Sequence, residues 1–494
     1  MNVMLVYPEF PDTFWSFKHA LRFVGKKSAF PPLGLLTVAA LLPDSWNTRL
    51  ADLNAGPLRK RDLAWADCVF VSGMIVQKPS ARTVVRRCKE AGLLVVAGGP
   101  MFCEDDPDFP EVDHFVLNEA EITLPRFLAD LERGEPKRIY TTGDFPDLRG
   151  TPTPRWELAQ LDRYASMCVQ YSRGCPHNCD FCNVTALLGR RVRTKTTRQI
   201  LDELDALDAC GWRGDVFFVD DNFIGNKRRL KTDLLPALIA RRNSGKRFHF
   251  HTEASIDLAD DDELMRLMVE AGFDKVFVGI ETPDDECLAE CSKRQNENRD
   301  MVRDVKRIQQ AGLQVQAGFI VGFDNDKASV FQRQIEFIQQ SGIVTAMVGM
   351  LQAPPGTRLY QRMKDEGRLL GHSTGDNVDG TTNIVPRMGL EQLQEGYRMI
   401  LRHIYHPKHY YARLLTFLKE YKVPPPELRS PITFQDLMAF GRSIVRLGIL
   451  GRERLHFWKM LLWIRLRRPE LLHLSVTLAI CGFHFRKVCR QQGL

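Results

Sequence analysis

The chain has 494 residues, of which 44% are hydrophobic and 26% charged, and this composition excludes a disordered chain. At this length one hydrophobic core is not expected to serve the whole chain, so we expect two to four domains. The net charge of +7 is unevenly placed: residues 441–494 contain eleven Lys/Arg and two Asp/Glu, which is +9, and the remaining residues therefore sum to −2.

Neither membrane spanning nor secretion is indicated. No apolar run reaches the roughly 20 residues that a transmembrane helix needs, and the opening MNVMLVYP lacks the pattern of a signal peptide. We therefore expect a cytoplasmic protein whose twelve cysteines are reduced, so that a tight group of them holds metal rather than forming disulfides.

Residues 1–140 alternate strand and helix patterns. The expected strands are NVMLVYP, TRLADLN, CVFVSG, LLVVAGGP and HFVLNEAE, and the expected helices are LLTVAALL, VVRRCKEAG and LPRFLADLERG. Continuous apolar strands separated by helices predict a doubly wound, Rossmann-like parallel sheet. Ligands bind such sheets at the carboxyl ends of the strands, which are Ser72-Gly73, Gly98-Gly99-Pro100 and Asn118-Glu119.

Three further regions follow. Residues 141–164 are rich in Pro, Gly, Thr and Asp and are expected to be a linker. Residues 165–360 repeat strand and helix six times, which predicts a partial (βα)6 TIM-type barrel with its site at the carboxyl ends of the strands. Residues 361–494 lose the strand pattern and are expected to form a helical, basic C-terminal domain.

The sequence SRGCPHNCDFC carries the most specific signal. It places Cys175, Cys179 and Cys182 in one loop after a strand. Thiolates are the ligands of iron–sulfur clusters, and three of them can hold three irons of a 4Fe–4S cubane while leaving the fourth iron open. A zinc site would need a second ligand pair, and Cys287 and Cys291, four residues apart on an expected helix, are interpreted as packing residues.

This motif at the first strand of a βα barrel resembles the radical S-adenosylmethionine superfamily. The opening domain, FFVDDNFIGNK, FVGIETPD and the helical tail are similar to its cobalamin-binding class. Within that class the chain resembles the subgroup with a C-terminal domain of unknown function, DUF4070, which includes the hopanoid C-2 methylase. The resemblance covers essentially the whole chain.

The resemblance implies contacts to S-adenosylmethionine. Phe181 matches the aromatic position near the adenine, and GFIVGFD, with Gly318, Val321 and Asp324, resembles the adenine-contacting fifth strand. Asp220-Asp221 stands where the superfamily has a GGE-type motif for the amino group, a departure that leaves this contact open. Glu253 and Glu281 are candidates for amine or ribose contacts, with capping or a salt bridge in the barrel mouth as the alternative.

The resemblance also implies cobalamin in the first domain. Cobalamin domains that supply a histidine ligand carry D-x-H-x-x-G, but here Asn54 stands at the histidine and Pro57 at the glycine, so no lower histidine ligand is expected. Binding would then rest on small residues at strand ends, Ser72, Gly73, Gly98, Gly99 and Pro100, with Asn118 and Glu119 as hydrogen-bonding groups. Turn formation alone is the alternative role of these glycines.

The function that the resemblance implies is radical C-methylation of an unactivated carbon, with electrons from flavodoxin or ferredoxin. One alternative keeps both cofactors but cyclises or rearranges its substrate, and another is a non-catalytic cobalamin sensor. A methylthiotransferase would need three further cluster cysteines, and Cys68, Cys88 and Cys103 are widely spaced. No general acid or base is assigned, and His177, His249 and His251 are left open between structural and site roles.

The basic tail GRERLHFWKMLLWIRLRRP combines arginines with Phe457, Trp458 and Trp463. One interpretation is a helix packed on the barrel with a solvated basic edge. The other is peripheral contact with anionic lipid, which would suit a small or lipid-like substrate. A nucleic-acid partner is not expected, because the charge is confined to one end and no recognised motif accompanies it.

Overall fold

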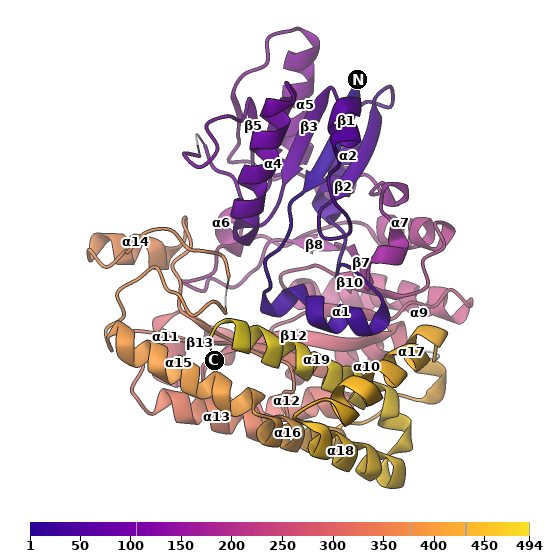
Figure 1. Cartoon of the computed structure of the whole chain (residues 1–494), viewed down its shortest axis with the longest axis vertical. Coiled ribbons are helices and arrows are strands. Elements are labelled where there is room, and N and C mark those ends of the chain that lie inside the picture. The colour runs from indigo at the N-terminus through magenta and orange to yellow at the C-terminus, as the bar shows by residue number, and fades with distance from the viewer. Residues whose placement is uncertain (105, 377, 430–431, 494) are drawn as a thin grey trace. The chain divides into compact units, whose positions relative to one another are not determined.

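The structure is a computed structural model that describes all residues except 105, 377, 430–431 and 494. The chain folds into two compact units, each assembled from several segments (Figure 1). The first unit contains residues 1–11, 27–174 and 187–214, and the second contains residues 12–26, 175–186 and 215–494.

The first unit is built on a parallel sheet with the strand order β2-β1-β3-β4-β5-β6. Its strands are β1 (Asn2–Tyr7), β2 (Asn47–Asp52), β3 (Cys68–Ser72), β4 (Leu94–Gly98), β5 (His114–Val116) and β6 (Ile139–Tyr140). Because β1 lies between β2 and β3, the winding reverses there, which confirms the predicted doubly wound sheet.

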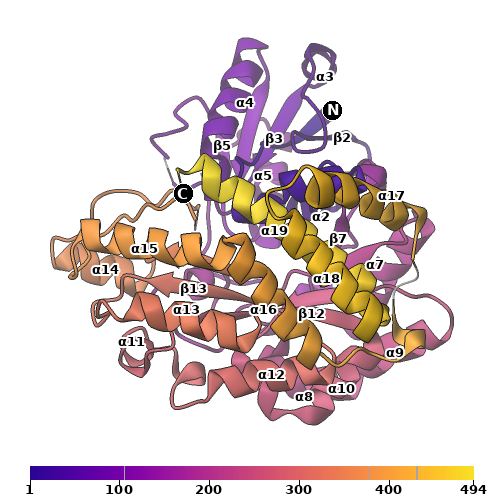
Figure 2. The ribbon, with the colours of Figure 1, turned by 60° about the horizontal axis from the view of Figure 1, so that its bottom comes forward.

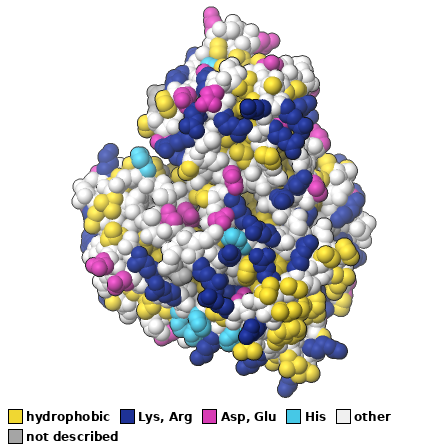
Figure 3. Space-filling view, in the orientation of Figure 1, with side chains coloured by type: hydrophobic (Ala, Val, Ile, Leu, Met, Phe, Trp, Pro, Cys, Tyr) yellow, Lys and Arg dark blue, Asp and Glu magenta, His cyan; other side chains and the backbone are white. Residues whose placement is uncertain are grey.

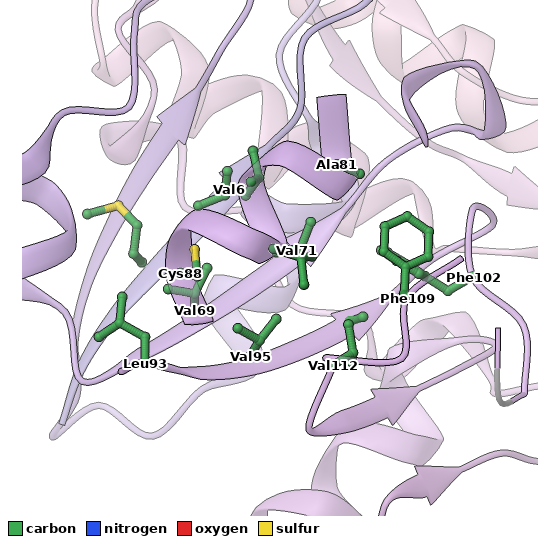
Figure 4. Packing of buried hydrophobic residues seen from close by; sticks show 14 of the residues in the cluster. Val6, Val69, Val71, Ala81, Cys88, Leu93, Val95, Phe102, Phe109 and Val112 are labelled. Carbon is green, nitrogen blue, oxygen red and sulfur yellow. The ribbon is translucent and has the colours of Figure 1, made fainter. Parts of the chain in front are cut away.

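Apolar strands buried on both faces form two core layers. The first unit's helices are α2 (Leu33–Leu41), α3 (Lys60–Trp65), α4 (Lys78–Glu90), α5 (Ala120–Glu132) and α7 (Thr197–Ala209). Along β1, Val3 and Leu5 join the layer under α2 and α5, whereas Met4 and Val6 join the layer under α4. This alternation places one set of side chains on each face of the sheet. Figure 4 shows the α4 layer, including Val6, Val69 and Cys88.

The fifth strand is shorter than expected. HFVLNEAE was predicted as one strand, but β5 ends at Val116 and α5 begins at Ala120. Asn118 between them has a φ of 62°, which an extended strand cannot accommodate. The turn at Asn118 therefore converts the second half of the predicted strand into a helix start.

Residues 141–164 pack against the first unit. Trp156 and Tyr164 are each 1% exposed, and short 3-10 turns follow Asp147, Arg155 and Gln160. The hydroxyl of Tyr164 donates a hydrogen bond to Asp52 Oδ2 at 2.8 Å, at the carboxyl end of β2. Buried aromatic side chains thus fix this segment, in spite of its turn-rich composition.

The second unit contains a parallel sheet in which the strands lie in the order β14-β13-β12-β11-β10. All six strands predicted between residues 165 and 360 form. They are β7 (Ser166–Val169, in the first unit), β10 (Asp215–Phe218), β11 (Phe250–Glu253), β12 (Phe273–Glu281), β13 (Gln314–Val321) and β14 (Ala346–Met350).

Helices separate these strands, as expected of βα repeats. They are α8 (Lys227–Arg229), α9 (Leu235–Asn243), α10 (Asp262–Ala271), α11 (Asp285–Glu290), α12 (Met301–Ala311) and α13 (Val330–Ser341). The strand interiors are apolar, and the polar residues follow their carboxyl ends, which is where βα folds place their sites.

The C-terminal region is helical, as predicted. Its helices are α14 (Arg358–Asp365), α15 (Leu390–Tyr405), α16 (Pro407–Glu420), α17 (Phe434–Ser443), α18 (Arg454–Arg467) and α19 (Leu472–Gln491). Helix α15 ends before Pro407 and α16 begins there, because proline cannot continue a helix ladder but fits the first position of a new helix. Figure 2 shows α15 lying over α13.

A short N-terminal segment belongs to the second unit. Helix α1 (Lys18–Val24) packs against α17 and α19. Phe14 stacks on Phe485 with ring centroids 4.1 Å apart, and Phe14 carbonyl lies 2.9 Å from His484 Nε2. Among the described helices, none is long and apolar enough to cross a bilayer.

Candidate functional site

The cysteine loop begins at a glycine that the backbone requires. Gly174 has a φ of 89°, and a Cβ there would lie 2.6 Å from Arg191 O. Only glycine adopts this conformation without strain. The turn ends the short strand β8 (Ser172–Arg173) and directs the chain into the loop from Cys175 to Cys182, after which α6 (Val184–Leu188) follows.

Other segments hold this loop in place. Asp180 N donates to Cys291 O at 3.0 Å, Leu359 N donates to Asp180 O at 3.0 Å, and Arg358 pairs with the Asp180 carboxylate. Gln295 Nε2 lies 3.7 Å from Cys179 Sγ. These contacts come from α11, α14 and the loop after α11, so the three cysteines sit on a backbone that is fixed from outside.

The three thiols act on one another electrostatically. Burial raises the pKa of Cys175, with Cys179 and Asp221 adding to it, and burial with Cys179 and Cys175 raises the pKa of Cys182 to about 12. Buried thiolates need positive charge, which an iron cluster provides, so this donor set fits a 4Fe–4S group. No set of three His, Cys, Asp or Glu in the described chain is spaced for a single metal ion.

Lys293 stands beside the cysteines, although no sequence pattern indicates a role for it. Its ammonium pairs with Glu281 Oε1, and both side chains are almost fully buried. Burial would lower the pKa of Lys293, but Glu281 and the thiolates of Cys179 and Cys182 raise it above its ordinary value. Lys293 is therefore a fixed positive charge next to the proposed cluster ligands.

A glycine on β12 lets the side chains of Glu281 and Lys293 lie close to the strand's backbone. A Cβ on Gly279 would lie 2.4 Å from Glu281 Oε1 and 2.6 Å from Lys293 Nζ. Glu281 itself has a φ of 63°, an uncommon conformation for glutamate that ends the strand and turns its carboxylate toward Lys293. Lys293 Nζ also lies 5.9 Å from the ring of Phe181.

The acidic residues predicted at the ends of β10 and β11 come together. Burial, with Asp221 and Asp220 adding to it, raises the pKa of Glu253 to about 8, and burial raises the pKa of Asp221 to about 6. Asp221 also acts on Cys175. Asp221 therefore links the carboxylates at the ends of β10 and β11 electrostatically to the cysteine loop.

Strand β13 is tightly packed between its neighbours β12 and β14. A Cβ on Gly318 would lie 3.0 Å from the ring of Phe277, and Val321 is fully buried. Asp324 pairs with Arg368, whereas Asp326 Oδ2 accepts hydrogen bonds from the Gly322 and Phe323 backbone. Phe323 in turn contacts the edge of Phe181, at 6.2 Å between ring centroids.

The glycines predicted for cobalamin make close contacts within the first unit. A Cβ on Gly98 would lie 2.5 Å from Val116 O, and one on Gly99 would lie 2.4 Å from Ser72 Oγ. Gly73 approaches Gln77 in the same way, with 2.9 Å from its ideal Cβ to Oε1. These residues, followed by Pro100, let the loops after β3 and β4 pack together at the carboxyl edge of the sheet.

The polar candidates of this edge already have protein partners. Asn118 Oδ1 accepts hydrogen bonds from Thr141 Oγ1 at 2.8 Å and from Thr142 N at 3.1 Å. The buried carboxylate of Glu119 pairs with Arg173 at 2.6 Å and with Arg193 at 2.7 Å. As cofactor ligands, Asn118 and Glu119 therefore remain proposals, and any such contact would add to these bonds.

Asn54, at the position of the missing histidine, fixes the loops after β1 and β2. Its Nδ2 donates to Asp52 Oδ1 at 2.8 Å and to Pro8 O at 3.1 Å, and its Oδ1 accepts from Phe10 N at 2.8 Å. The side chain thus closes the carboxyl edge of the sheet beside β1.

The other cysteine and histidine candidates lie in packing positions or outside the cysteine loop. Cys68 and Cys88 are buried in the two different core layers of the first unit, so they cannot ligate one cluster with Cys103, which is exposed. Cys287 and Cys291 are buried behind the cysteine loop, as expected of packing residues. His251 stacks on Phe217 and His249 precedes β11, so both lie at the amino end of that strand, away from Glu253.

His177 lies inside the cysteine loop. Burial lowers its pKa, while the negative charge of Asp257 opposes this shift. Lys227 pairs with Asp257 at 2.7 Å and also lowers the pKa of His177. A neutral imidazole in this position is compatible with a loop or hydrogen-bonding role.

The chain matches two family models and several curated proteins. The model of the radical SAM superfamily matches residues 169–338, and that of a domain of unknown function, DUF4070, matches residues 357–493. An uncharacterized methyltransferase of Synechocystis is 42% identical, over 100% of this chain and 93% of that protein. The hopanoid C-2 methylase of Rhodopseudomonas palustris is 35% identical, over 97% of this chain and 92% of that protein.

Solved structures share the fold. OxsB, a cobalamin-dependent S-adenosylmethionine radical enzyme with aqua-cobalamin bound, matches with a TM-score of 0.61 and 14% identity, over 99% of this chain and 80% of that chain. TsrM from Kitasatospora setae, with cobalamin and a 4Fe–4S cluster bound, gives 0.58 and 15%, over 95% and 99%.

Proposed function

The chain belongs to the radical SAM superfamily, in the family of the hopanoid C-2 methylase, and we propose that it is a cobalamin-dependent C-methyltransferase. Its substrate would be an unactivated carbon of a small or lipid-like metabolite. The observation that carries the proposal is that Asp221, after β10, acts on the thiol of Cys175 in the cysteine loop and also on Glu253, the last residue of β11.

We assign each cofactor to its own set of residues. Cys175, Cys179 and Cys182 would ligate the 4Fe–4S cluster, and the carboxyl edge of the first unit's sheet would receive cobalamin without a histidine ligand. When bound, the cluster and S-adenosylmethionine supply a 5′-deoxyadenosyl radical and cobalamin supplies the methyl group. The remaining chemistry belongs to this chain's own side chains.

Glu253, Asp220 and Asp221 are suited to bind the amino group of S-adenosylmethionine. Their burial holds the pKa of Glu253 near 8 and that of Asp221 near 6, so an ammonium group would favour their ionised forms. Lys293 reduces the repulsion between the buried thiolates and forms an ion pair with Glu281. Phe181 would then contact the adenine ring, and Gly318 and Val321 would line its edge.

The partners follow from this chemistry. Reduction of the cluster requires an external one-electron donor, for which flavodoxin or ferredoxin is the expected class. A lipid-like substrate is proposed because the family includes a hopanoid methylase. Peripheral membrane contact through the basic C-terminal helices would give access to such a substrate.

The test is isotopic. Anaerobically reconstituted enzyme is supplied with a polycyclic isoprenoid and S-adenosylmethionine labelled in its methyl group, and the product is analysed by mass spectrometry. Methyl transfer predicts a labelled product, heavier by one methyl group in place of hydrogen. An unlabelled product of altered structure would support cyclisation or rearrangement instead.

Replacing Cys179 with serine tests the cluster ligands, and Cys210→Ser is the matched control. Cys179→Ser should lose product and bound iron together, whereas Cys210→Ser, which changes an exposed cysteine, should retain both. If the native chain binds cobalamin tightly but gives no product with any candidate substrate, a non-catalytic sensor would be favoured over the enzyme.

A further inference from the structure

The C-terminal helices carry an apolar surface that no part of the described chain covers. Of the twenty large apolar side chains exposed in the described chain, twelve lie between residues 432 and 472. Soluble proteins seldom leave such a concentration in contact with water. Those twelve, which we call the apolar face, are Ile432, Phe434, Leu437, Met438, Val445, Ile449, Leu450, Leu455, Trp458, Leu462, Leu466 and Leu472.

The face arises because its helices are apolar on more than one side. In α18, Phe457, Met460 and Ile464 point into the core, whereas Leu455 and Leu466 are 78% and 71% exposed. A helix that only covered the barrel would need the buried set alone. Figure 3 shows hydrophobic side chains gathered over α17 and α18, beside a band of lysine and arginine.

A cavity of about 780 Å³ opens at the edge of this face. Its walls come from α1, α17, the π-helical segment Ile444–Ile449 and α19, all of which belong to the second unit. Phe23, Leu437 and Leu450 supply part of its apolar lining. Its cationic lining is Arg22, Arg442, Arg446, Arg452, Arg486, Lys487 and Arg490.

The positive charge of the cavity is not neutralised from within. Glu453, its acidic lining residue, is committed to Arg486 through a buried ion pair of 2.7 Å. Arg442 donates to Phe23 O at 2.6 Å, and Arg446 lies 5.3 Å from the Phe483 ring. For the other cationic residues of the lining, the described part of the chain offers no carboxylate within ion-pair distance.

We propose that this surface docks on a membrane that contains anionic phospholipid, and that a lipid phosphate binds in the arginine-lined cavity. The inference deepens the proposed membrane contact and rests on it, but it uses none of the residues that hold the cofactors. Guanidinium groups bind phosphate oxygens through paired hydrogen bonds, and the exposed leucines and Trp458 would enter the interfacial region.

The combination of arginines with exposed aliphatic side chains favours an anionic membrane over other partners. A nucleic acid would use the arginines but would leave the aliphatic side chains of the apolar face in water. An acidic protein would also leave these aliphatic side chains in water, unless it had an apolar surface of its own. Only a lipid interface offers phosphate and hydrocarbon next to each other along one boundary.

The experiment is flotation of the full chain with vesicles. Phosphatidylcholine vesicles are compared with vesicles that also contain phosphatidylglycerol, and binding should require the anionic lipid. The triple variant Arg22→Gln, Arg446→Gln and Arg490→Gln should lose about a hundredfold in partitioning, since each basic residue near an anionic surface contributes roughly fivefold.

A matched control removes three positive charges that lie outside the cavity, one on α5 of the first unit and two on the second unit. Arg126, Arg228 and Arg303 are exposed and lie outside the cavity, so changing them to glutamine should leave binding within about twofold, because screening weakens distant charges. A second variant, Leu455→Ser, Leu462→Ser and Leu466→Ser, should weaken binding to the same vesicles while the circular dichroism spectrum stays native.

Soluble glycerol phosphate separates a phosphate site from a membrane site. At millimolar concentration it should compete only weakly, because it lacks the hydrocarbon that the apolar face would bury; full displacement would overturn the membrane assignment. Three other results would also overturn it. These are equal binding to both vesicle types, an equal loss of vesicle binding in the control variant of Arg126, Arg228 and Arg303, and binding of the chain to DNA without binding to vesicles. Methyl transfer to detergent-solubilised substrate is measured separately, so failure of either proposal can be recognised.

Discussion

At the scale of single residues, the buried pair of Lys293 and Glu281 has the sharpest energetic consequence. Replacing Lys293 with methionine leaves a buried carboxylate without its partner, and such losses cost about 3–5 kcal/mol. We expect Lys293→Met to lower the free energy of unfolding of the cofactor-free chain by about 3 kcal/mol, measured by urea titration.

A double variant tests whether the loss comes from the unpaired charge. Glu281→Gln with Lys293→Met removes both charges and should regain a large part of the stability. If the double variant is as unstable as the sum of the single ones, the two side chains do not stabilise each other. Lys327→Met, at an exposed ion pair with Glu286, is the control and should cost less than about 1 kcal/mol.

Glu253 gives the chain a pH dependence with a defined sign. Burial, with Asp221 and Asp220 adding to it, raises the pKa of this carboxyl from 4.5 to about 8 in the folded chain. Below pH 4.5 the group is protonated in both states and costs nothing. As the pH rises toward 8, only the unfolded chain ionises it, so folding stability is lost.

The variant Glu253→Gln removes this titration. The native chain and the variant should diverge between pH 4.5 and 8, the native chain losing up to about 1.4 kcal/mol per pH unit relative to the variant. Urea unfolding of the cofactor-free chain at several pH values measures the difference. Glu395→Gln, at an exposed position of α15, should run parallel to the native chain; a parallel curve for Glu253→Gln would contradict the assignment.

Sequence patterns identified some of these residues and missed others for physical reasons. Cys175, Cys179 and Cys182 are close in sequence, so their spacing alone predicts a shared ligand. Lys293 lies twelve residues beyond Glu281, and the positive φ at Glu281 turns its carboxylate toward the lysine. No local period records a contact of that kind. The contacts that we assign to S-adenosylmethionine and cobalamin stay predictions.

At the scale of elements, the turn before the cysteine loop should be sensitive to a single methyl group. Gly174→Ala would place a Cβ 2.6 Å from Arg191 O at a φ of 89°, so the turn must shift. We expect a loss of at least about 2 kcal/mol in unfolding free energy and reduced iron incorporation, measured by urea titration and iron assay.

The matched substitution is Gly134→Ala, at the end of α5. It has a comparable φ of 77°, but its Cβ would meet nothing within 4 Å. Only the backbone strain of about 1 kcal/mol should remain, and iron incorporation should be unchanged. Equal effects of the two substitutions would mean that the contact with Arg191 does not determine the loop.

The elements also show where sequence patterns are reliable. The central strands were predictable because short apolar runs bounded by turn residues are typical of strands that are buried on both faces of a sheet. Strand β6, which contains only Ile139 and Tyr140, is too short to leave a pattern. Strand β5 keeps only three of its eight predicted residues, because the chain turns at Asn118. Helix α1 was not predicted at all; its environment comes from α17 and α19, more than 400 residues away.

At the scale of the whole molecule, the two proposed cofactor sites belong to different units. The cluster cysteines are part of the second unit, and the strand ends proposed for cobalamin are part of the first, each with its own hydrophobic core. Such units can hold their ligands independently, because the free energy of binding is supplied by local contacts. Loss of one cofactor should therefore leave the other bound.

Cys179→Ser tests this independence on the intact chain. After anaerobic reconstitution, native protein should contain about four iron and four sulfide ions per chain and cobalt equimolar with the chain. The variant should lose most iron and sulfide, since two thiolates hold a cubane poorly, while its cobalt content stays native. Loss of cobalt together with iron, in a variant whose unfolding curve is unchanged, would show that both cofactors share one site.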